Sequence, residues 1–218
     1  MGLSRLRAAC QRDFMLSRSE FILGGQRSGK SRRAELLARD WLALAPSHQA
    51  VLIATATTWD DEMRERIARH QLDRAERVPG MQTIEEPIKL GEAIQTHSQP
   101  HTLVVVDCLT LWLTNLLMPH ENAEISPENA ENDPENVSKE AVAQKIQAQA
   151  ASLLIAIKNA RGPVVLVGNE IGLGVIPMGR ETRAFVDALG RLNQDVAAAC
   201  ERVTFMAAGL PLFLKGQL

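Results

Sequence analysis

The chain has 218 residues, of which 45% are apolar and 23% are charged, and its formal net charge is −2. This composition is that of an ordinary globular protein, and it excludes fibrous and wholly disordered classes. The length suits one sizeable domain. A near-neutral chain lacks the basic field that recruits nucleic acid, so we expect no nucleic-acid partner.

The cysteines and the apolar runs indicate a reducing compartment and no membrane span. Cys10, Cys108 and Cys200 are widely spaced and odd in number, and no pair of them is spaced like a zinc site. No apolar run approaches the roughly 18 residues that a transmembrane helix needs. We therefore expect a cytoplasmic protein.

Two segments differ from the rest of the chain. Residues 1–18 are expected to form a flexible N-terminal tail, which leaves residues 19–218 as a single domain. Residues 119–140 contain seven acidic residues and one lysine. The Pro, Asn and Glu content of residues 126–138 cannot form a core, so we expect a mobile acidic insertion at about 120–138.

Short apolar runs alternate with helical patterns along the chain. Strands are expected at residues 21–23, 51–54, 103–107, 163–168 and 202–207. Helices are expected at residues 31–44, about 60–74, 139–160 and about 181–200. Near-continuous apolar strands separated by helices are typical of a mostly parallel sheet with helices on both faces. The predicted fold class is α/β, with ligands bound beyond the carboxyl ends of the strands.

The strongest chemical signal is a match to G-x-x-x-x-G-K-[ST] between an expected strand and an expected helix. The motif is made of Gly24, Gly25, Gln26, Arg27, Ser28, Gly29, Lys30 and Ser31. Its glycines let backbone N–H groups converge on phosphate oxygens, and the helix that follows adds its positive end. Lys30 is expected to neutralise the β- and γ-phosphates, and the Ser31 hydroxyl to bind Mg²⁺. The predicted fold is therefore of the P-loop NTPase type.

Asp107 is a second candidate for the metal. It ends the apolar run at residues 104–106, which is the position of the carboxylate that holds Mg²⁺ through its water shell in P-loop enzymes. The alternative is that Asp107 only caps the next turn.

His70 has two interpretations. On the expected helix it shares a face with Met63 and Ile67, and periodicity alone favours a histidine at the edge of the core. Alternatively, a neutral imidazole attacks an α-phosphate and holds the nucleotide covalently, with nearby arginines stabilising the phosphate charge. The residue pattern does not decide between them.

Seven stretches, in order between about residues 20 and 215, match one known family. They are GGQRSGKSRRAE, IATAT, DDEMRERIARHQ, TIEEP, VVDCLTLWLTNLL, VGNEIGLGVIP and GRLNQDVAAACERVTFMAAGLPLFLK. With them the chain resembles the bifunctional adenosylcobinamide kinase/adenosylcobinamide-phosphate guanylyltransferases of cobalamin biosynthesis. The family often continues with R-P and a Trp where this chain has RAERVPGM at residues 74–81.

The resemblance implies two activities in one site region. ATP or GTP would phosphorylate the aminopropanol hydroxyl of adenosylcobinamide. GTP would then guanylylate a histidine, here His70, and the enzyme would pass GMP to adenosylcobinamide phosphate to give adenosylcobinamide-GDP. The resemblance also implies a Mg²⁺ requirement and a homotrimer with a site between neighbouring subunits.

The family's GTP contacts map onto residues of this chain at five places. They are residues 24–31, then Thr55, Ala56 and Thr57, then Gln71, Leu72, Asp73 and Arg74, and finally Glu85 and Asp107. A single-activity kinase in which His70 is structural is one alternative. A non-catalytic nucleotide switch is the other.

Several further residues also have two interpretations each. Asn169 and Glu170 end an expected strand, where they either reach the site or cap a turn. Arg180 and Arg183 either bind phosphate or form surface salt bridges. Cys108 is expected to be a small buried residue rather than a reactive thiol. The tryptophans either pack in the core or face the corrin ring; they are Trp41, Trp59 and Trp112.

Overall fold

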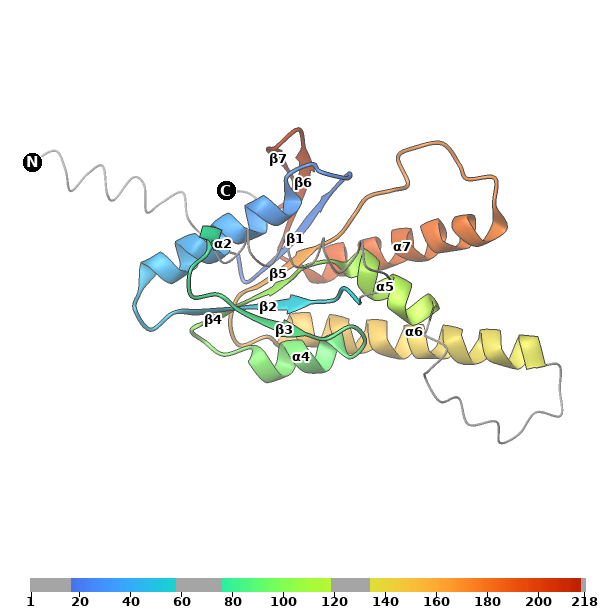
Figure 1. The fold of residues 1–218 in the computed structure, drawn as a ribbon, viewed down its shortest axis with the longest axis horizontal. Helices are drawn as coiled ribbons and strands as arrows, with labels where there is room; N and C mark the ends of the chain where they lie inside the picture. The colour runs from blue at the N-terminus through green and yellow to red at the C-terminus, as the bar shows by residue number, and fades with distance from the viewer. Residues whose placement is uncertain (1–16, 58–75, 119–133, 217–218) are drawn as a thin grey trace, which may run out of the picture.

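The computed structural model describes residues 17–57, 76–118 and 134–216, which form a seven-stranded sheet and five helices (Figure 1). The strands are β1 (Ser19–Gly24), β2 (Gln49–Ala54), β3 (Gln82–Glu85), β4 (Thr102–Val106), β5 (Val164–Val167), β6 (Arg202–Ala207) and β7 (Leu210–Lys215). The helices are α2 (Lys30–Leu44), α4 (Leu90–His97), α5 (Leu109–Leu117), α6 (Pro134–Asn159) and α7 (Arg180–Ala199).

The sheet has the strand order β3-β2-β4-β5-β1-β6-β7. The first six strands in that order pair in parallel, and β7 pairs antiparallel with β6 at one edge. The P-loop strand β1 lies inside the sheet, between β5 and β6. The prediction of a mostly parallel α/β sheet is confirmed.

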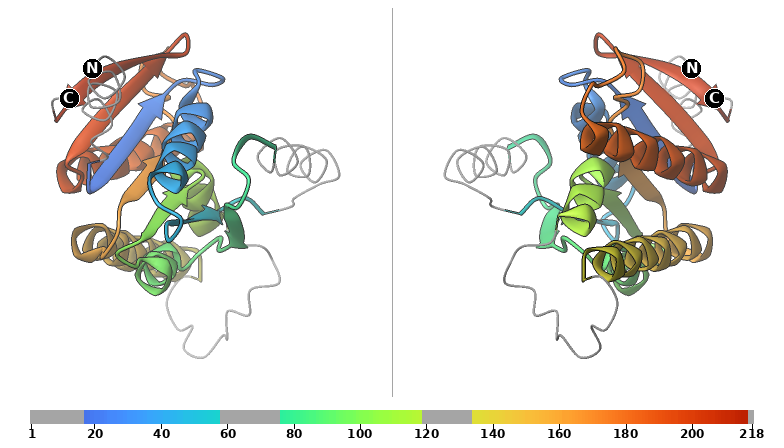
Figure 2. Two further views of the ribbon diagram at one scale, coloured as in Figure 1. Left: turned by 90° about the vertical axis from the view of Figure 1, so that its left-hand side faces the viewer. Right: turned by 90° about the vertical axis from the view of Figure 1, so that its right-hand side faces the viewer.

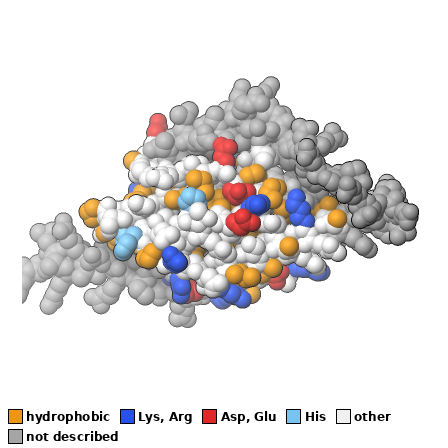
Figure 3. All heavy atoms as spheres, turned by 90° about the horizontal axis from the view of Figure 1, so that it is seen from below, with side chains coloured by type: hydrophobic (Ala, Val, Ile, Leu, Met, Phe, Trp, Pro, Cys, Tyr) orange, Lys and Arg blue, Asp and Glu red, His pale blue; other side chains and the backbone are white. Residues whose placement is uncertain are grey.

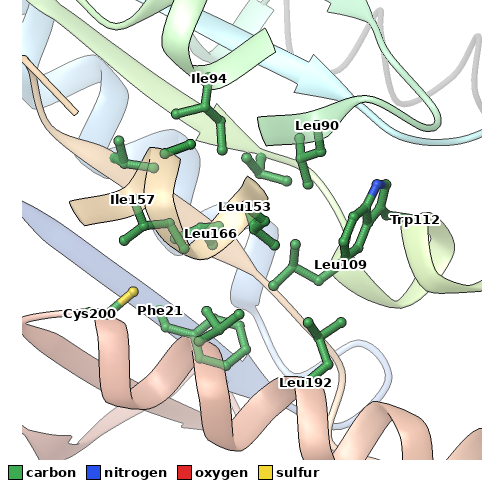
Figure 4. Packing of buried hydrophobic residues seen from close by; sticks show 14 of the residues in the cluster. Phe21, Leu90, Ile94, Leu109, Trp112, Leu153, Ile157, Leu166, Leu192 and Cys200 are labelled. Atoms are coloured by element: carbon green, nitrogen blue, oxygen red, sulfur yellow. The ribbon is translucent and has the colours of Figure 1, made fainter. Parts of the chain in front are cut away.

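Helices cover both faces of the sheet, because alternate residues of the buried strands point to opposite sides. Phe21 of β1 belongs to a core that includes side chains of α4, α5, α6 and α7, whereas its neighbour Ile22 belongs to a core that includes side chains of α2. Figure 4 shows Phe21, Leu109 and Leu192 converging in the first core, and Figure 2 shows α2 on the face opposite to α7.

The buried strands were predicted, whereas four other elements were not. Strands β1, β2, β4, β5 and β6 lie where apolar runs indicated them, and α2 and α7 lie within a residue of their expected bounds. The elements without a sequence prediction are β3, α4, α5 and β7.

One helix boundary was wrong. Helix α6 begins at Pro134 rather than at residue 139, so the last five residues of the expected loop 126–138 are helical. Pro is well suited to the first turn of a helix, where its missing N–H needs no partner. The rest of that loop and the helix expected at about 60–74 lie outside the described residues, as do residues 1–16.

The surface of the described residues carries charges of both signs. On the face that includes α4 and α6, acidic and basic side chains are interspersed with apolar ones (Figure 3). None of the helices in the described ranges combines the length and the apolar character needed to cross a bilayer.

Candidate active site

The described site residues lie at the end of the sheet where the parallel strands have their carboxyl ends. Following the strand order, this end of the sheet carries Glu85 at the end of β3, residues 55–57 after β2, Asp107 after β4, Asn169 and Glu170 after β5, and residues 24–31 at the end of β1. Parallel α/β sheets bind their ligands beyond the carboxyl ends of their strands. We call this arrangement the site row.

The phosphate loop, residues 24–31, contains three residues with positive φ. Gly24 has φ 153°, and a Cβ there would overlap the carbonyl oxygen of Met206 and lie 2.6 Å from Ser28 Oγ. Gly29 has φ 100° at the N-cap of α2, and Arg27 has φ 53°. A non-glycine residue in the left-handed region is uncommon and is concentrated at functional sites. Such alternating backbone turns make concave cradles of N–H groups for anions.

Neighbouring strands hold the phosphate loop at two points. The Glu170 N–H, just after β5, donates to the Gly24 carbonyl at 3.1 Å. The Gly209 N–H, in the turn between β6 and β7, donates to the Ser28 carbonyl at 3.0 Å. Within the described residues, Ser28 Oγ is a buried polar atom without a hydrogen-bond partner. The loop is therefore fixed from both sides and leaves one hydroxyl for a ligand.

The side chain of Lys30 is buried against the earlier residues of the phosphate loop. Its side chain is only 8% exposed, and its ammonium donates to the Gly25 carbonyl at 2.6 Å. Removal from water lowers the pKa of Lys30 below its ordinary value. A buried ammonium with a lowered pKa is stabilised by a nearby anion, so this position suits a phosphate group.

Ser31 and Asp107 line one small pocket of about 10 Å³, together with Glu35 and with apolar side chains of α2, β2, β4 and β5. A hydroxyl and a carboxylate are oxygen ligands of the kind that Mg²⁺ takes, and Mg²⁺ usually keeps waters and nucleotide phosphates as its other ligands. Within the described ranges, no group of three or more His, Cys, Asp and Glu side chains could hold a metal. A hydroxyl and a carboxylate supply only part of a Mg²⁺ coordination shell, so Ser31 and Asp107 suit a metal that is bound together with a nucleotide.

Asn115 of α5 organises the middle of the site row, and sequence reasoning did not identify it. Its side-chain amide donates to the carbonyls of Thr55 at 2.7 Å and Pro87 at 3.2 Å, and its Oδ1 accepts from Thr57 Oγ1 at 3.0 Å. Thr55 is fully buried and donates its hydroxyl to the Cys108 carbonyl at 2.7 Å. The sequence did contain one indication of this role, because Asn115 is an amide side chain within the largely apolar segment LTLWLTNLL.

Of the other residues predicted to contact the nucleotide, some lie at the carboxyl ends of β2 and β3, and the rest lie outside the described residues. Glu85 is exposed and pairs in register with Ala54, one residue before Thr55, and Ala56 is half-buried. Four strand spacings separate β3 from β1, or about 19 Å. The residues outside the described ranges are His70, Gln71, Leu72, Asp73 and Arg74.

The residues with two interpretations are placed as follows. Cys108 is half-buried and caps α5, and its burial raises the pKa of its thiol, so it is not an activated nucleophile. Trp112 is fully buried and donates its indole N–H to the Ile88 carbonyl at 2.8 Å, which makes it a core residue. The Asn169 N–H donates to Thr110 Oγ1 at 3.0 Å.

Known proteins resemble this chain over nearly its whole length. A family model described as cobinamide kinase / cobinamide phosphate guanyltransferase matches residues 20–214. The bifunctional adenosylcobalamin biosynthesis protein CobP of Pseudomonas aeruginosa is 42% identical and aligns with 91% of this chain and 98% of its own. The corresponding protein CobU of Escherichia coli is 37% identical, with 89% and 98% covered.

One solved structure gives a weaker likeness. The flagellar accessory protein FlaH of Methanocaldococcus jannaschii is 10% identical with a TM-score of 0.46, over 91% of this chain and 78% of its own. That likeness is too low to support a functional conclusion. The family model and the curated relatives agree, and the chain belongs to the cobinamide kinase/cobinamide phosphate guanyltransferase family.

Proposed function

We propose that this chain phosphorylates the aminopropanol hydroxyl of adenosylcobinamide and then transfers GMP from GTP to the resulting phosphate. The observation that carries the proposal is the phosphate loop itself, which holds the buried ammonium of Lys30 and is followed by Ser31, a residue that lines one pocket with Asp107. This arrangement suits a nucleoside triphosphate in a chain of this family. Cys108 and Cys200 are free thiols, which supports the further inference of a cytoplasmic enzyme.

In the kinase step, the substrate hydroxyl attacks the γ-phosphate of ATP or GTP. A bond forms between the hydroxyl oxygen and the γ-phosphorus, and the bond from that phosphorus to the β,γ-bridging oxygen breaks. The nucleoside diphosphate leaves, and the hydroxyl proton is released to solvent. Lys30 turns from the Gly25 carbonyl toward the β- and γ-phosphates, and backbone N–H groups of the phosphate loop hold their oxygens. The phosphate supplies the partner that Ser28 Oγ lacks.

Ser31 and Asp107 are the residues that would hold Mg²⁺ with the nucleotide. Mg²⁺ would supply positive charge to the phosphate oxygens. Glu85 and residues 55–57 remain proposed nucleotide contacts.

In the guanylyltransfer, we propose His70 as the nucleophile, on the basis of the family resemblance of its R-I-x-x-H segment. One imidazole nitrogen attacks the α-phosphorus of GTP, and pyrophosphate leaves. A phosphate oxygen of adenosylcobinamide phosphate then attacks the same phosphorus, the phosphorus–nitrogen bond breaks, and adenosylcobinamide-GDP is released. Residues 71–74 are proposed to contact the same nucleotide.

A homotrimer with a site between subunits is part of the proposal. The distance of about 19 Å between β3 and β1 along the site row supports it, since one subunit's phosphate loop could face residues 55–57 and 85 of another. Mixing Lys30→Ala and His70→Ala proteins tests this geometry by complementation. Restored guanylyltransfer in the mixture supports a shared site, and its absence from re-formed oligomers argues for sites within single subunits.

The central experiment is labelling of the protein with GTP and Mg²⁺ in the absence of any corrinoid. GTP carrying label in the α-phosphate should leave an acid-labile, base-stable adduct on the denatured protein, and GTP labelled in the γ-phosphate should leave none. The adduct should disappear in His70→Ala. His97→Ala is the matched control, because His97 ends helix α4 and has no proposed role in catalysis.

The outcomes separate the proposal from its alternatives. Label that persists in His70→Ala would remove His70 from the mechanism. No label in the wild type, together with normal GTP binding and corrinoid phosphorylation, would leave a single-activity kinase. GTP binding without either reaction would indicate a nucleotide switch.

A further inference from the structure

Two exposed apolar surfaces flank the phosphate loop. The first is the apolar loop, residues 171–178, between β5 and α7, in which Val175 is 96% and Met178 is 95% exposed. The second is a row of leucines on the edge strand β7, at Leu210, Leu212 and Leu214. Single exposed apolar side chains are ordinary, but contiguous ones next to a catalytic site mark a binding surface.

Both surfaces are tied to the phosphate loop by backbone hydrogen bonds. The apolar loop follows Glu170, whose N–H donates to the Gly24 carbonyl at 3.1 Å. The leucine row follows Gly209, whose N–H donates to the Ser28 carbonyl at 3.0 Å. Proximity alone therefore does not tell which surface receives a substrate.

The strand order distinguishes the two surfaces. Strand β5 lies between β1, which leads into the phosphate loop, and β4, which leads to Asp107. The apolar loop therefore begins between the two groups that hold the triphosphate and its metal. Strand β7 lies two places beyond β1 on the opposite side. On the path between the phosphate loop and Asp107 an acceptor therefore meets the apolar loop, whereas the leucine row lies on the far side of the phosphate loop.

The apolar loop is held in a defined shape, which Figure 1 shows as the long connection between β5 and α7. At its start the Gly172 N–H donates to Glu170 Oε1 at 2.7 Å. At its end the Arg183 guanidinium donates to the carbonyls of Pro177 at 3.0 Å and Met178 at 2.5 Å. These contacts at both ends keep the apolar side chains presented to solvent.

A hollow of about 240 Å³ lies between this loop and α7. Its lining includes Ile171, Val175 and Ile176 from the loop, and Arg183 and Asp187 from the helix. Whole-ligand pockets are usually larger, about 300–1,000 Å³. The hollow thus suits one arm of a large ligand, with the remainder lying across the exposed apolar side chains.

We propose that the apolar loop and its hollow bind the corrinoid substrate, a deepening that rests on the proposed function. The apolar edge of the macrocycle lies on Val175, Ile176 and Met178, where it buries their exposed surfaces. One amide arm enters the hollow, where the Asp187 carboxylate accepts from its N–H₂ group. The aminopropanol arm extends toward the γ-phosphate between the phosphate loop and Asp107.

The test is steady-state kinase activity with adenosylcobinamide varied at saturating nucleotide. The double variant Val175→Ser/Met178→Ser removes two nearly fully exposed apolar side chains, so the fold is expected to persist. We expect its KM for the corrinoid to rise at least about tenfold, with kcat within about twofold of the wild type. Asp187→Asn should raise the same KM by a smaller factor.

The matched control is Leu44→Ser/Ile155→Ser, which removes two apolar side chains that are about half-exposed and lie on helices α2 and α6. It should leave the corrinoid KM unchanged. A second comparison, Leu210→Ser/Leu212→Ser, tests the leucine row. If that variant raises the corrinoid KM and the loop variant does not, the proposal is overturned.

Two further readouts separate this inference from the function on which it rests. Guanylylation of the protein by GTP without corrinoid should be unchanged in the loop variant, because no corrinoid takes part. An unchanged corrinoid KM in an active loop variant refutes the inference alone, whereas a wild type without kinase activity refutes the proposed function. If sedimentation velocity shows that the loop variant loses its oligomer, the loop is a subunit contact and the proposal is wrong.

Discussion

Asn115 and Thr55 are 60 residues apart in sequence and are joined by a 2.7 Å hydrogen bond from the side-chain amide to the backbone carbonyl. Because the same amide reaches the Pro87 carbonyl and the same side chain accepts from Thr57, one buried residue connects α5 to the segments that follow β2 and β3. The proposed nucleotide contacts at residues 55–57 are thus held by this side chain together with the hydrogen bond from the Thr55 hydroxyl to the Cys108 carbonyl.

Asn115→Leu should destabilise the protein by about 3 kcal/mol, because it leaves the carbonyls of Thr55 and Pro87 buried without this donor, at roughly 1–3 kcal/mol each. Urea denaturation measures the loss. Thr96→Ala is the comparison, since its exposed hydroxyl bonds only the Glu92 carbonyl at 2.9 Å and should contribute less than about 0.5 kcal/mol. Equal losses in the two variants would show that Asn115 does not act as a connector.

Gly24→Ala should destabilise the protein by about 1–3 kcal/mol and reduce GTP binding, because its Cβ would overlap the Met206 carbonyl. Gly25→Ala is the matched substitution, as a Cβ there meets nothing within 4 Å. Thermal unfolding of the two variants without nucleotide makes the comparison. A Gly24→Ala protein as stable as Gly25→Ala would mean that β6 can move away from the phosphate loop.

Lys30→Ala should weaken GTP binding by about 10- to 100-fold, which corresponds to a charge-assisted hydrogen bond of about 1.5–3 kcal/mol. Binding of GMP should change little, because GMP lacks the phosphates that Lys30 is proposed to contact. Isothermal titration calorimetry with both nucleotides gives the ratio. A parallel loss of GMP affinity would indicate that Lys30 supports the fold of the loop instead.

GTP affinity should fall as pH rises toward and beyond the pKa of Lys30 in the free protein. Burial lowers that pKa below 10.5, and a neighbouring triphosphate raises it in the complex, so binding takes up a proton at pH values between the two. Lys30→Arg keeps its charge throughout this range. The ratio of wild-type to Lys30→Arg affinity, measured from pH 7 to 10, should therefore decline, and a flat ratio would contradict a protonated Lys30 in the complex.

The interior of the sheet was predictable from sequence, whereas its edges were not. Strands such as β4, TLVVV, are buried on both faces and therefore read as unbroken apolar runs. Strand β3 reads QTIE and is mostly exposed, and β7 reads LPLFLK with apolar residues on both faces, so neither shows the alternation of apolar and polar residues that predicts a strand. Helix α5, LTLWLTNLL, is apolar on nearly all sides, which hides its helical period.

The candidate site also contains residues that the sequence identified and one that it did not. The phosphate loop was predictable because its groups are contiguous, and their chemistry fixes both residue type and spacing. Asp107 was predictable because a carboxylate at the end of a buried strand is conspicuous. The role of Asn115 was not, because its partners Thr55 and Pro87 are brought to it only by the order of β2, β3 and β4 in the sheet.

The position of β1 has a consequence for how the protein is made. Among the described strands β1 comes earliest in the chain, yet its partners are β5 and β6, and the Ser19 hydroxyl accepts from the Glu201 N–H across 182 residues of sequence. Contacts of such long range form slowly because a large loop must close first. The phosphate loop therefore receives its full flanking support only after β6 and the turn that follows it have been made, and a nascent chain that stalls before β6 would be unable to bind nucleotide.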